Sequence, residues 1–293
     1  MSTGSAEGFI EVSGHRLFYR SFGSGEQGTI LTLHGGPGAT HDYMLPVSAL
    51  ADYGYRVVFY DMLGSGKSDA PEDLSLYRIE NWANEAEEVR DALELGKVHM
   101  LGHSLGGSIA LSYALSYQDQ LRSLIVSSGF ASAPLLISEI SRLEAQLTKE
   151  SREAISKAEQ SRDFKSPEYK AAVKEFMDKH YQYGFREFNP PELLNTLAHF
   201  NKRLYRSLWG PTEFRVTGSL KSWDISDLLG RITVPCLITV GRYDEATPEV
   251  ARDMHRRIRG SRLVVFEESS HNAMLEERDA YVRTVAEFLG GIR

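Results

Sequence analysis

The segment Val98-His-Met-Leu-Gly-His-Ser-Leu-Gly-Gly-Ser-Ile-Ala110 carries the strongest indication of how this chain folds. It joins a short apolar run, Val98–Leu101, to a stretch with helical periodicity through the turn Gly102-His-Ser-Leu-Gly106. In the G-x-S-x-G pattern the serine lies on a strained strand-to-helix turn, and glycines flank it because larger residues would clash there. The segment therefore predicts a strand, a sharp turn and a helix, with the Ser104 hydroxyl directed into a cleft.

Short apolar runs bounded by Gly, Pro or Asp recur on both sides of this segment and predict the strands of one sheet. From the third run onward they alternate with stretches of helical periodicity, such as Ile79–Leu95, and this alternation predicts a mostly parallel sheet covered by helices. Further helices are expected over about Pro248–Ile258 and up to Leu289. The predicted strands are Phe9–Val12, Arg16–Phe22, Thr29–Leu33, Val57–Tyr60, Val98–Leu101, Leu124–Ser128, Cys236–Gly241 and Leu263–Phe266.

The strand pattern is interrupted between about Ala133 and Gly218, where Glu, Lys, Ala, Leu and aromatic residues dominate. This composition predicts helices. We therefore expect residues 1–132 and 219–293 to form an α/β core, and residues 133–218 to form a helical cap over the carboxyl ends of the strands, where open sheets bind ligands. Four aromatic residues of this segment either line a substrate pocket or pack the cap helices together: Tyr181, Tyr183, Phe185 and Phe188.

Composition and charge exclude several classes of protein. Of 293 residues, 42% are hydrophobic, and the net charge of -7 provides no excess of basic groups for nucleic acid or an anionic membrane. The first eight residues resemble no secretory signal, and no apolar stretch could span a bilayer. We therefore expect a cytoplasmic protein whose ligand is a small molecule or peptide. The single cysteine, Cys236, lies in an apolar run and is expected in the core.

Two glycine-rich segments resemble nucleotide-binding motifs only superficially. Gly64-Ser-Gly-Lys-Ser68 would need a glycine where the chain has Asp61 to form a P-loop. Gly23-Ser-Gly-Glu-Gln-Gly28 joins two predicted strands rather than a strand and a helix, and we interpret it as a hairpin turn. Because no His, Cys, Asp or Glu cluster has metal-ligand spacing either, we expect no cofactor and no metal.

A nucleophilic serine needs a base, and nine histidines are candidates. Where G-x-S-x-G carries the nucleophile, the acid and then the histidine follow it, each on a loop after a strand. Only His271 follows the last predicted strand, and Asp244 follows the strand Cys236–Gly241, with Glu245 as the alternative acid. The order predicts that Ser104 attacks, His271 acts as the base and Asp244 orients the imidazole.

The oxyanion formed during such an attack needs backbone donors beside the serine. The segment His34-Gly-Gly-Pro-Gly38 directly follows the strand Thr29–Leu33, and its glycines allow the backbone to approach a substrate carbonyl. We assign the oxyanion hole to the N–H groups of Gly36 and Leu105.

Together these motifs resemble the proline iminopeptidases, or prolyl aminopeptidases, of the α/β-hydrolase superfamily, over nearly the whole chain. The resemblance implies the α/β-hydrolase fold with an inserted cap, and a serine aminopeptidase that releases N-terminal proline, or other small or apolar residues, from short peptides through an acyl-enzyme. It rests on His34–Gly38, His41–Tyr43, Phe59–Asp61, Gly64–Gly66 with Ser68, the turn around Ser104, and Gly241–Pro248.

Within that family the chain is most similar to the archaeal iminopeptidases that work with the tricorn protease, through Trp209–Phe214 and Thr217–Asp224. This similarity implies possible association with a larger protease. In such enzymes glutamates hold the free α-amino group of the peptide, and the matching positions are Glu213 and Glu245. Carboxylates suit the task because an ammonium group that loses its water needs charged acceptors.

The sequence leaves several alternatives open. Leu105 stands where many bacterial family members have Trp, which leaves room for a broader aminopeptidase or an amino-acid amidase. An ester or lactone hydrolase could use the same three residues, since the fold does not choose the substrate. A catalytically silent ligand-binding protein on this scaffold is a fourth possibility.

Overall fold

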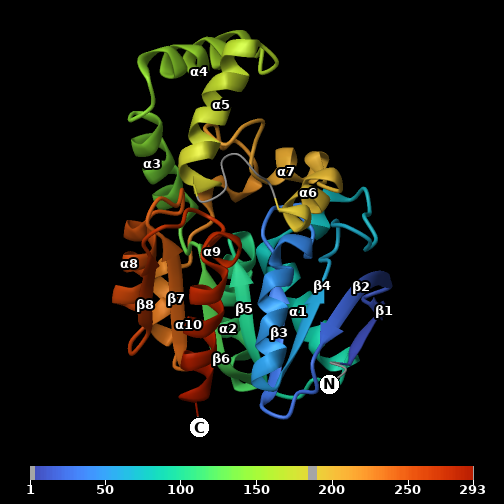
Figure 1. Ribbon diagram of the computed structural model, residues 1–293. Coiled ribbons are helices and arrows are strands. Elements are labelled where there is room, and N and C mark those ends of the chain that lie inside the picture. Colours follow the sequence, from blue (N-terminus) through green and yellow to red (C-terminus); the bar gives the residue numbers. More distant parts are fainter. Residues whose placement is uncertain (1–3, 184–189, 293) are drawn as a thin grey trace.

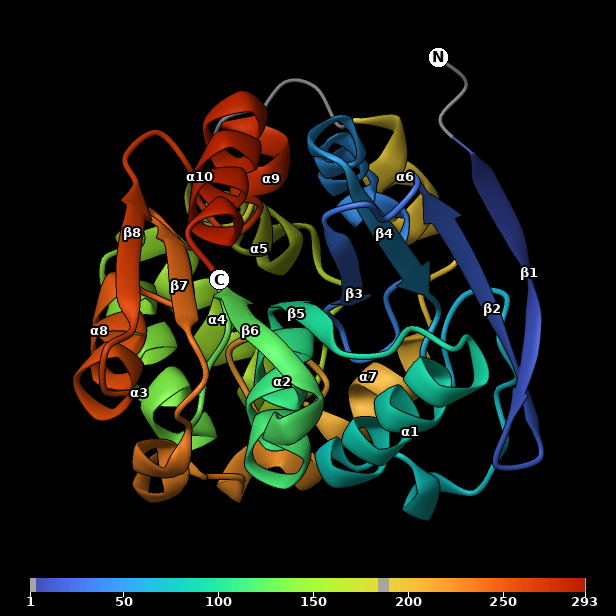
Figure 2. The same cartoon turned by 90° about the horizontal axis from the view of Figure 1, so that it is seen from below.

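A twisted sheet forms the centre of the molecule in the computed structural model, which describes residues 4–183 and 190–292 (Figures 1 and 2). Within these residues the sheet has eight strands in the order β1-β2-β4-β3-β5-β6-β7-β8. The pairs β1–β2 and β2–β4 are antiparallel and all other pairs are parallel. The strands are β1 (Ser5–Val12), β2 (His15–Phe22), β3 (Gly28–Leu33), β4 (Tyr55–Tyr60), β5 (Val98–His103), β6 (Leu121–Ser127), β7 (Cys236–Gly241) and β8 (Arg262–Phe266).

Helices cover both faces of the sheet, so the inner strands are apolar on both sides. In β4, Val58 and Tyr60 belong to the core cluster that includes residues of α1, α2 and α8, whereas Val57 and Phe59 belong to the cluster that includes residues of η1 and α10. Cys236 is buried as expected, and burial raises the pKa of its thiol to about 12. The covering elements are η1 (Asp42–Tyr53), α1 (Ile79–Ala92), α2 (Leu105–Tyr117), α8 (Pro248–Arg257), α9 (Ala273–Glu276) and α10 (Arg278–Gly290).

The segment between β6 and β7 is helical wherever the structure shows regular elements, and it stands at one end of the sheet (Figure 1). Two short 3₁₀ turns, η5 and η6, lead the chain back to β7. The described part of the chain contains no helix long and apolar enough to cross a membrane. The helices and turns of the segment are α3 (Ala133–Glu144), α4 (Lys149–Ser161), α5 (Pro167–His180), α6 (Pro191–Ala198), α7 (Lys202–Leu208), η5 (Ser219–Ser222) and η6 (Ser226–Arg231).

The predicted fold class is confirmed, and one local interpretation is wrong. Gly23–Gly28 was expected to be a hairpin turn, but the strands it joins do not pair, because β4 lies between β2 and β3 in the sheet. The segment does turn back locally, since the Gly28 N–H donates to the Gly25 carbonyl at 3.0 Å. The segment then leads into β3, which pairs with β4 and not with β2.

The strand register brings four loops together at one edge of the sheet. Leu33 of β3 lies beside Gly102 of β5, so the loops that follow these strands begin next to each other. Gly241 of β7 lies beside Phe266 of β8 in the same way. Because parallel strands end at the same edge, all the loops predicted to carry function lie on the side where α3 to α7 stand.

Candidate active site

Ser104 occupies the turn between β5 and α2 in a strained conformation, with φ 56° and ψ -125°. Its N–H donates to the Ser127 carbonyl on the neighbouring strand at 2.9 Å. The turn leaves no space for a side chain at Gly106, where a Cβ atom would lie 2.1 Å from the Leu33 carbonyl oxygen. Along residues 98–114, Ser104 is the single residue that is not buried, and it lines two pockets.

His271 and Asp244 meet on the loops that follow β8 and β7. Nδ1 of His271 lies 2.7 Å from Oδ1 of Asp244, and both side chains are buried. The same carboxylate oxygen accepts the Ala246 N–H at 2.8 Å, which holds it in place. Because the carboxylate accepts from Nδ1–H, the neutral ring keeps Nε2 free of a proton, and Nε2 has no hydrogen-bond partner within the described residues. Of the two acids considered, Asp244 is the one bonded to His271.

The loop His34–Gly38 approaches Ser104 from β3. Gly36 has φ 129°, a conformation that glycine adopts without strain, and it is the single residue of the stretch 30–41 that is not buried. Leu105 is the first residue of α2, where backbone N–H groups lack intrahelical partners. Gly36, Ser104 and Leu105 line one pocket.

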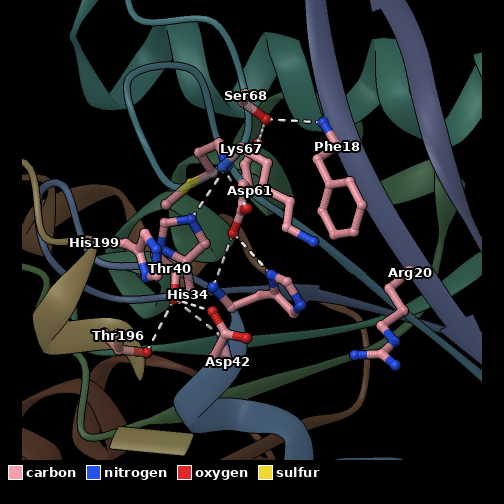
Figure 3. Close-up of polar contacts among 12 residues, drawn as sticks. Phe18, Arg20, His34, Thr40, Asp42, Asp61, Lys67, Ser68, Thr196 and His199 are labelled. Atoms are coloured by element: carbon pink, nitrogen blue, oxygen red, sulfur yellow. Dashed lines mark hydrogen bonds and ion pairs between the residues drawn. The ribbon is translucent and has the colours of Figure 1, made fainter. Parts of the chain in front are cut away.

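Buried hydrogen bonds hold the loop His34–Gly38 and the residues that follow it in place (Figure 3). Asp61 accepts the His41 N–H at 3.0 Å and the His41 ring at 2.8 Å, and it also accepts the Lys67 N–H at 2.9 Å. The Met62 N–H donates to Nε2 of His34 at 3.1 Å, so Nδ1 of His34 donates to the Gly35 carbonyl at 2.8 Å. His34 and His41 are therefore used to hold the loop, and Lys67 contributes its backbone rather than a phosphate-binding side chain.

Tyr43 and His103 link the same loop to the base, and sequence reasoning missed both. The Tyr43 oxygen accepts the Gly35 N–H at 2.6 Å and lies 2.7 Å from Nδ1 of His103. Nε2 of His103 lies 2.7 Å from the carbonyl of His271. A carbonyl only accepts, so Nε2 carries the proton and Nδ1 accepts the Tyr43 O–H. Burial lowers the pKa of His103 to about 3, consistent with a neutral ring.

Glu213 and Glu245 share a pocket with Ser104 and Leu105, which we name the acidic pocket. Burial raises the pKa of Glu213, and its carboxylate accepts the hydroxyl of Tyr205. Burial, together with the negative charges of Glu213 and Asp244, raises the pKa of Glu245 well above its ordinary value. The pocket has an empty volume of about 330 Å³, and its walls include Phe130, Leu136, Tyr181, Tyr205, Trp209 and Leu220.

A second pocket, which we name the α6 pocket, adjoins the acidic pocket at Ser104. It shares Gly36, Ser104, Tyr181 and Tyr205 with the acidic pocket but contains neither glutamate. His271 also lines this pocket. The other lining residues include Ala39, Tyr43, Leu193, Leu197, Phe200 and Asn272.

The four aromatic residues of the inserted segment do not share one role. Tyr181 lines both pockets, and its ring centroid lies 4.4 Å from that of His271. Tyr183 stacks on Tyr243 with ring centroids 3.9 Å apart, which is a packing contact. Phe185 and Phe188 lie outside the described residues. Tyr205 and Trp209 of the same segment line the acidic pocket, a role that the sequence analysis did not assign to them, although they precede Glu213 at regular spacings of four.

Sequence comparison with known proteins identifies relatives that are α/β hydrolases. The family model of the α/β hydrolase fold matches residues 28–278. The proline iminopeptidase of Saccharolobus solfataricus is 44% identical over 97% of this chain and 92% of its own length. That of Thermoplasma volcanium is 41% identical over 97% of this chain and 96% of its own.

Solved structures give the same result. The proline iminopeptidase from Mycobacterium smegmatis superposes with a TM-score of 0.90 at 29% identity, over 97% of this chain and 98% of that one. VinJ superposes with a TM-score of 0.93 at 31% identity, over 98% and 99% of the two chains. The family expected from the sequence is thereby confirmed. The chain belongs to the proline iminopeptidase family of α/β hydrolases, and it is an enzyme of the serine hydrolase type.

Proposed function

We propose that this enzyme releases N-terminal residues, proline among them, from short peptides through an acyl-enzyme. The observation that carries the proposal is the placement of Glu213 and Glu245 in the same pocket as Ser104 and Leu105. Two partly desolvated carboxylates beside a nucleophile form a binding site for a cation, and the α-amino group of the first residue is the cation nearest the first peptide bond.

In the first half of the reaction, Oγ of Ser104 attacks the carbonyl carbon of the first residue while Nε2 of His271 takes the hydroxyl proton. Asp244 stabilises the imidazolium through Nδ1. The N–H groups of Gly36 and Leu105 donate to the oxyanion. The C–N bond then breaks, the leaving nitrogen receives the proton from Nε2, and the shortened peptide departs.

In the second half, water attacks the ester carbon of the acyl-enzyme and gives its proton to Nε2 of His271. When the ester bond breaks, the proton passes to Oγ of Ser104 and the first residue leaves as a free amino acid. Both halves use the same base and the same donors, so no further group is required from the chain.

The walls of the acidic pocket favour a compact apolar first residue. Besides the two glutamates, the lining includes the apolar residues Phe130, Leu136, Trp209 and Leu220. Because proline and residues with small apolar side chains are compact and apolar, the proposal includes both.

The amine requirement is tested by comparing proline arylamide with its N-acetyl counterpart. Acetylation removes the cation and leaves the glutamates without a cationic partner, and sites built around a polar group reject analogues that lack it by about 10⁴ in kcat/KM. Glu213→Gln should lower kcat/KM for the free amine and narrow this gap. Glu150→Gln, on an exposed position of α4, is the matched control, and Ser104→Ala reports background hydrolysis.

Comparable kcat/KM values on the two arylamides would contradict the proposal and favour an esterase or lactonase. Turnover of proline amide together with failure on every proline dipeptide would identify an amino-acid amidase instead. The finer expectations stay predictions: a cytoplasmic location, association with a larger protease, and a division of the chain into a core of 1–132 and 219–293 and a cap of 133–218.

A further inference from the structure

We propose that the α6 pocket binds the residue that follows the scissile bond and selects a large apolar side chain at that position. This inference rests on the proposed function and extends it from the first residue of the peptide to the second. The α6 pocket is distinct from the acidic pocket, and the two meet at Gly36, Ser104, Tyr181 and Tyr205.

The position of His271 indicates which pocket binds the residue before the scissile bond and which binds the residue after it. The imidazole must give its proton to the leaving nitrogen, so the leaving group has to lie on the side of the serine where His271 lies. His271 lines the α6 pocket and does not line the acidic pocket. With the α-amino group held by Glu213 and Glu245, the chain beyond the broken bond therefore runs into the α6 pocket.

The lining of the α6 pocket fits an apolar side chain. Ala39, Leu193, Leu197 and Phe200 supply its carbon surface. Among the described residues that line it there is no Lys, Arg, Asp or Glu. A charged second residue would lose water there without gaining an ionic partner, whereas a leucine or phenylalanine side chain would bury apolar surface.

Helix α6 is anchored to the loop that carries Gly36, so the pocket has a defined wall. Oγ1 of Thr196, which is buried, accepts the Tyr43 N–H at 3.1 Å and lies 3.0 Å from Oγ1 of Thr40 (Figure 3). Just beyond the helix, the Asn201 N–H donates to the Gly38 carbonyl at 2.8 Å. These contacts hold Leu193 and Leu197 beside the reaction centre.

Two leucines of α6 provide a matched pair for the test. Leu194 and Leu197 are both 51% exposed, but only Leu197 lines the pocket. Because both are half exposed, truncation of either leaves no core cavity, and both variants are expected to fold as the wild type does.

The experiment measures kcat/KM for four dipeptide amides, Pro-Phe, Pro-Leu, Pro-Gly and Pro-Asp, with wild type, Leu197→Ala and Leu194→Ala. Wild type should prefer Phe and Leu over Gly by about tenfold or more, since one or two buried methylenes already change kcat/KM by about tenfold. Leu197→Ala should lower kcat/KM for Pro-Phe about fivefold more than for Pro-Gly, and Leu194→Ala should match wild type on all four.

Equal kcat/KM for Phe, Gly and Asp in wild type would overturn the inference, and so would equal losses on Pro-Phe in the two leucine variants. Failure of the proposed function gives a different result. In that case none of the four amides is cleaved, although a fluorophosphonate still labels Ser104. A preference for Asp over Phe would also overturn the inference, because it would require a cation in the pocket.

Discussion

At the scale of single residues, Tyr43 connects two parts of the site that come from distant strands. Its oxygen accepts from Gly35 in the loop after β3, and its proton goes to His103, whose ring donates to the backbone of His271. The hydroxyl therefore couples the loop that we propose as part of the oxyanion hole to the backbone of His271, the proposed base. We regard Tyr43 and His103 as positioning residues, since they act through these neighbours.

Tyr43→Phe keeps the ring and removes this coupling. The Gly35 N–H and Nδ1 of His103 both lose a partner, and a buried unpaired polar group costs about 1–3 kcal/mol. We expect kcat to fall about tenfold or more while KM changes little, because the loss concerns the placement of donors at the transition state. Tyr117→Phe, which removes an exposed hydrogen bond to Asn84, is the control. A lower melting temperature with unchanged kcat would show a purely structural role.

Glu245 predicts a pH dependence of stability whose sign follows from its raised pKa. In the unfolded chain the carboxyl ionises near its ordinary pKa, and in the fold it holds its proton to higher pH. Across that window the folded state binds more protons than the unfolded state, so the free energy of unfolding decreases as pH rises. Each unit of pKa difference corresponds to about 1.4 kcal/mol.

Glu245→Gln should remove this loss. The melting temperature of the variant, relative to wild type, should increase from pH 5 to pH 8, and Glu150→Gln should follow wild type throughout. Melting curves recorded at unit steps of pH measure the difference. Parallel pH profiles for wild type and Glu245→Gln would mean that Glu245 ionises in the fold as readily as in the unfolded chain.

At the scale of elements, we expect the helices α3 to α7 to limit what can reach Ser104. They stand over the edge of the sheet where the functional loops gather (Figure 1), and Leu193, Thr196 and Leu197 of α6 line the α6 pocket. Such a cover admits a short peptide more easily than a chain that continues into a folded domain.

Peptide length should therefore affect kcat/KM. We expect a proline-initiated peptide of two to four residues to be cleaved at least about tenfold faster than a folded protein with the same two N-terminal residues. The comparison uses initial rates of proline release at matched concentrations, with the unfolded form of the same protein as the control for access. Equal rates for the short peptide and the folded protein would show that the helices do not act as a sieve.

At the scale of the whole molecule, the sequence predicted those features that depend on neighbours along the chain. The turn around Ser104, the loop with Gly36 and the loops with Asp244 and His271 each follow a strand directly, so local patterns locate them. The ends of the strands were predicted less accurately. For example, β6 begins at Leu121, whereas the prediction began at Leu124. The exposed Arg122 interrupts the apolar run, so the pattern missed the first residues of the strand.

Features that depend on distant partners were not predictable in the same way. The segment Gly23–Gly28 looks like a hairpin turn locally, and only the order of strands in the whole sheet shows that β4 separates its two flanking strands. The contact of Tyr43 with His103 spans 60 residues, and that of His103 with His271 spans 168. No spacing in the sequence indicates such pairs, because they arise when the sheet assembles.

The exposure of α6 also has an evolutionary consequence. In the proposed complex, Leu197 contacts the residue that follows the scissile bond, yet its side chain is half exposed. Substitutions at such positions change the free energy of unfolding by only about 0.5 kcal/mol. Replacement of Glu245, by contrast, alters a buried carboxyl group. After gene duplication, descendants of this enzyme can therefore drift in their choice of second residue without passing through unstable intermediates, while the demand for a free N-terminus is inherited unchanged.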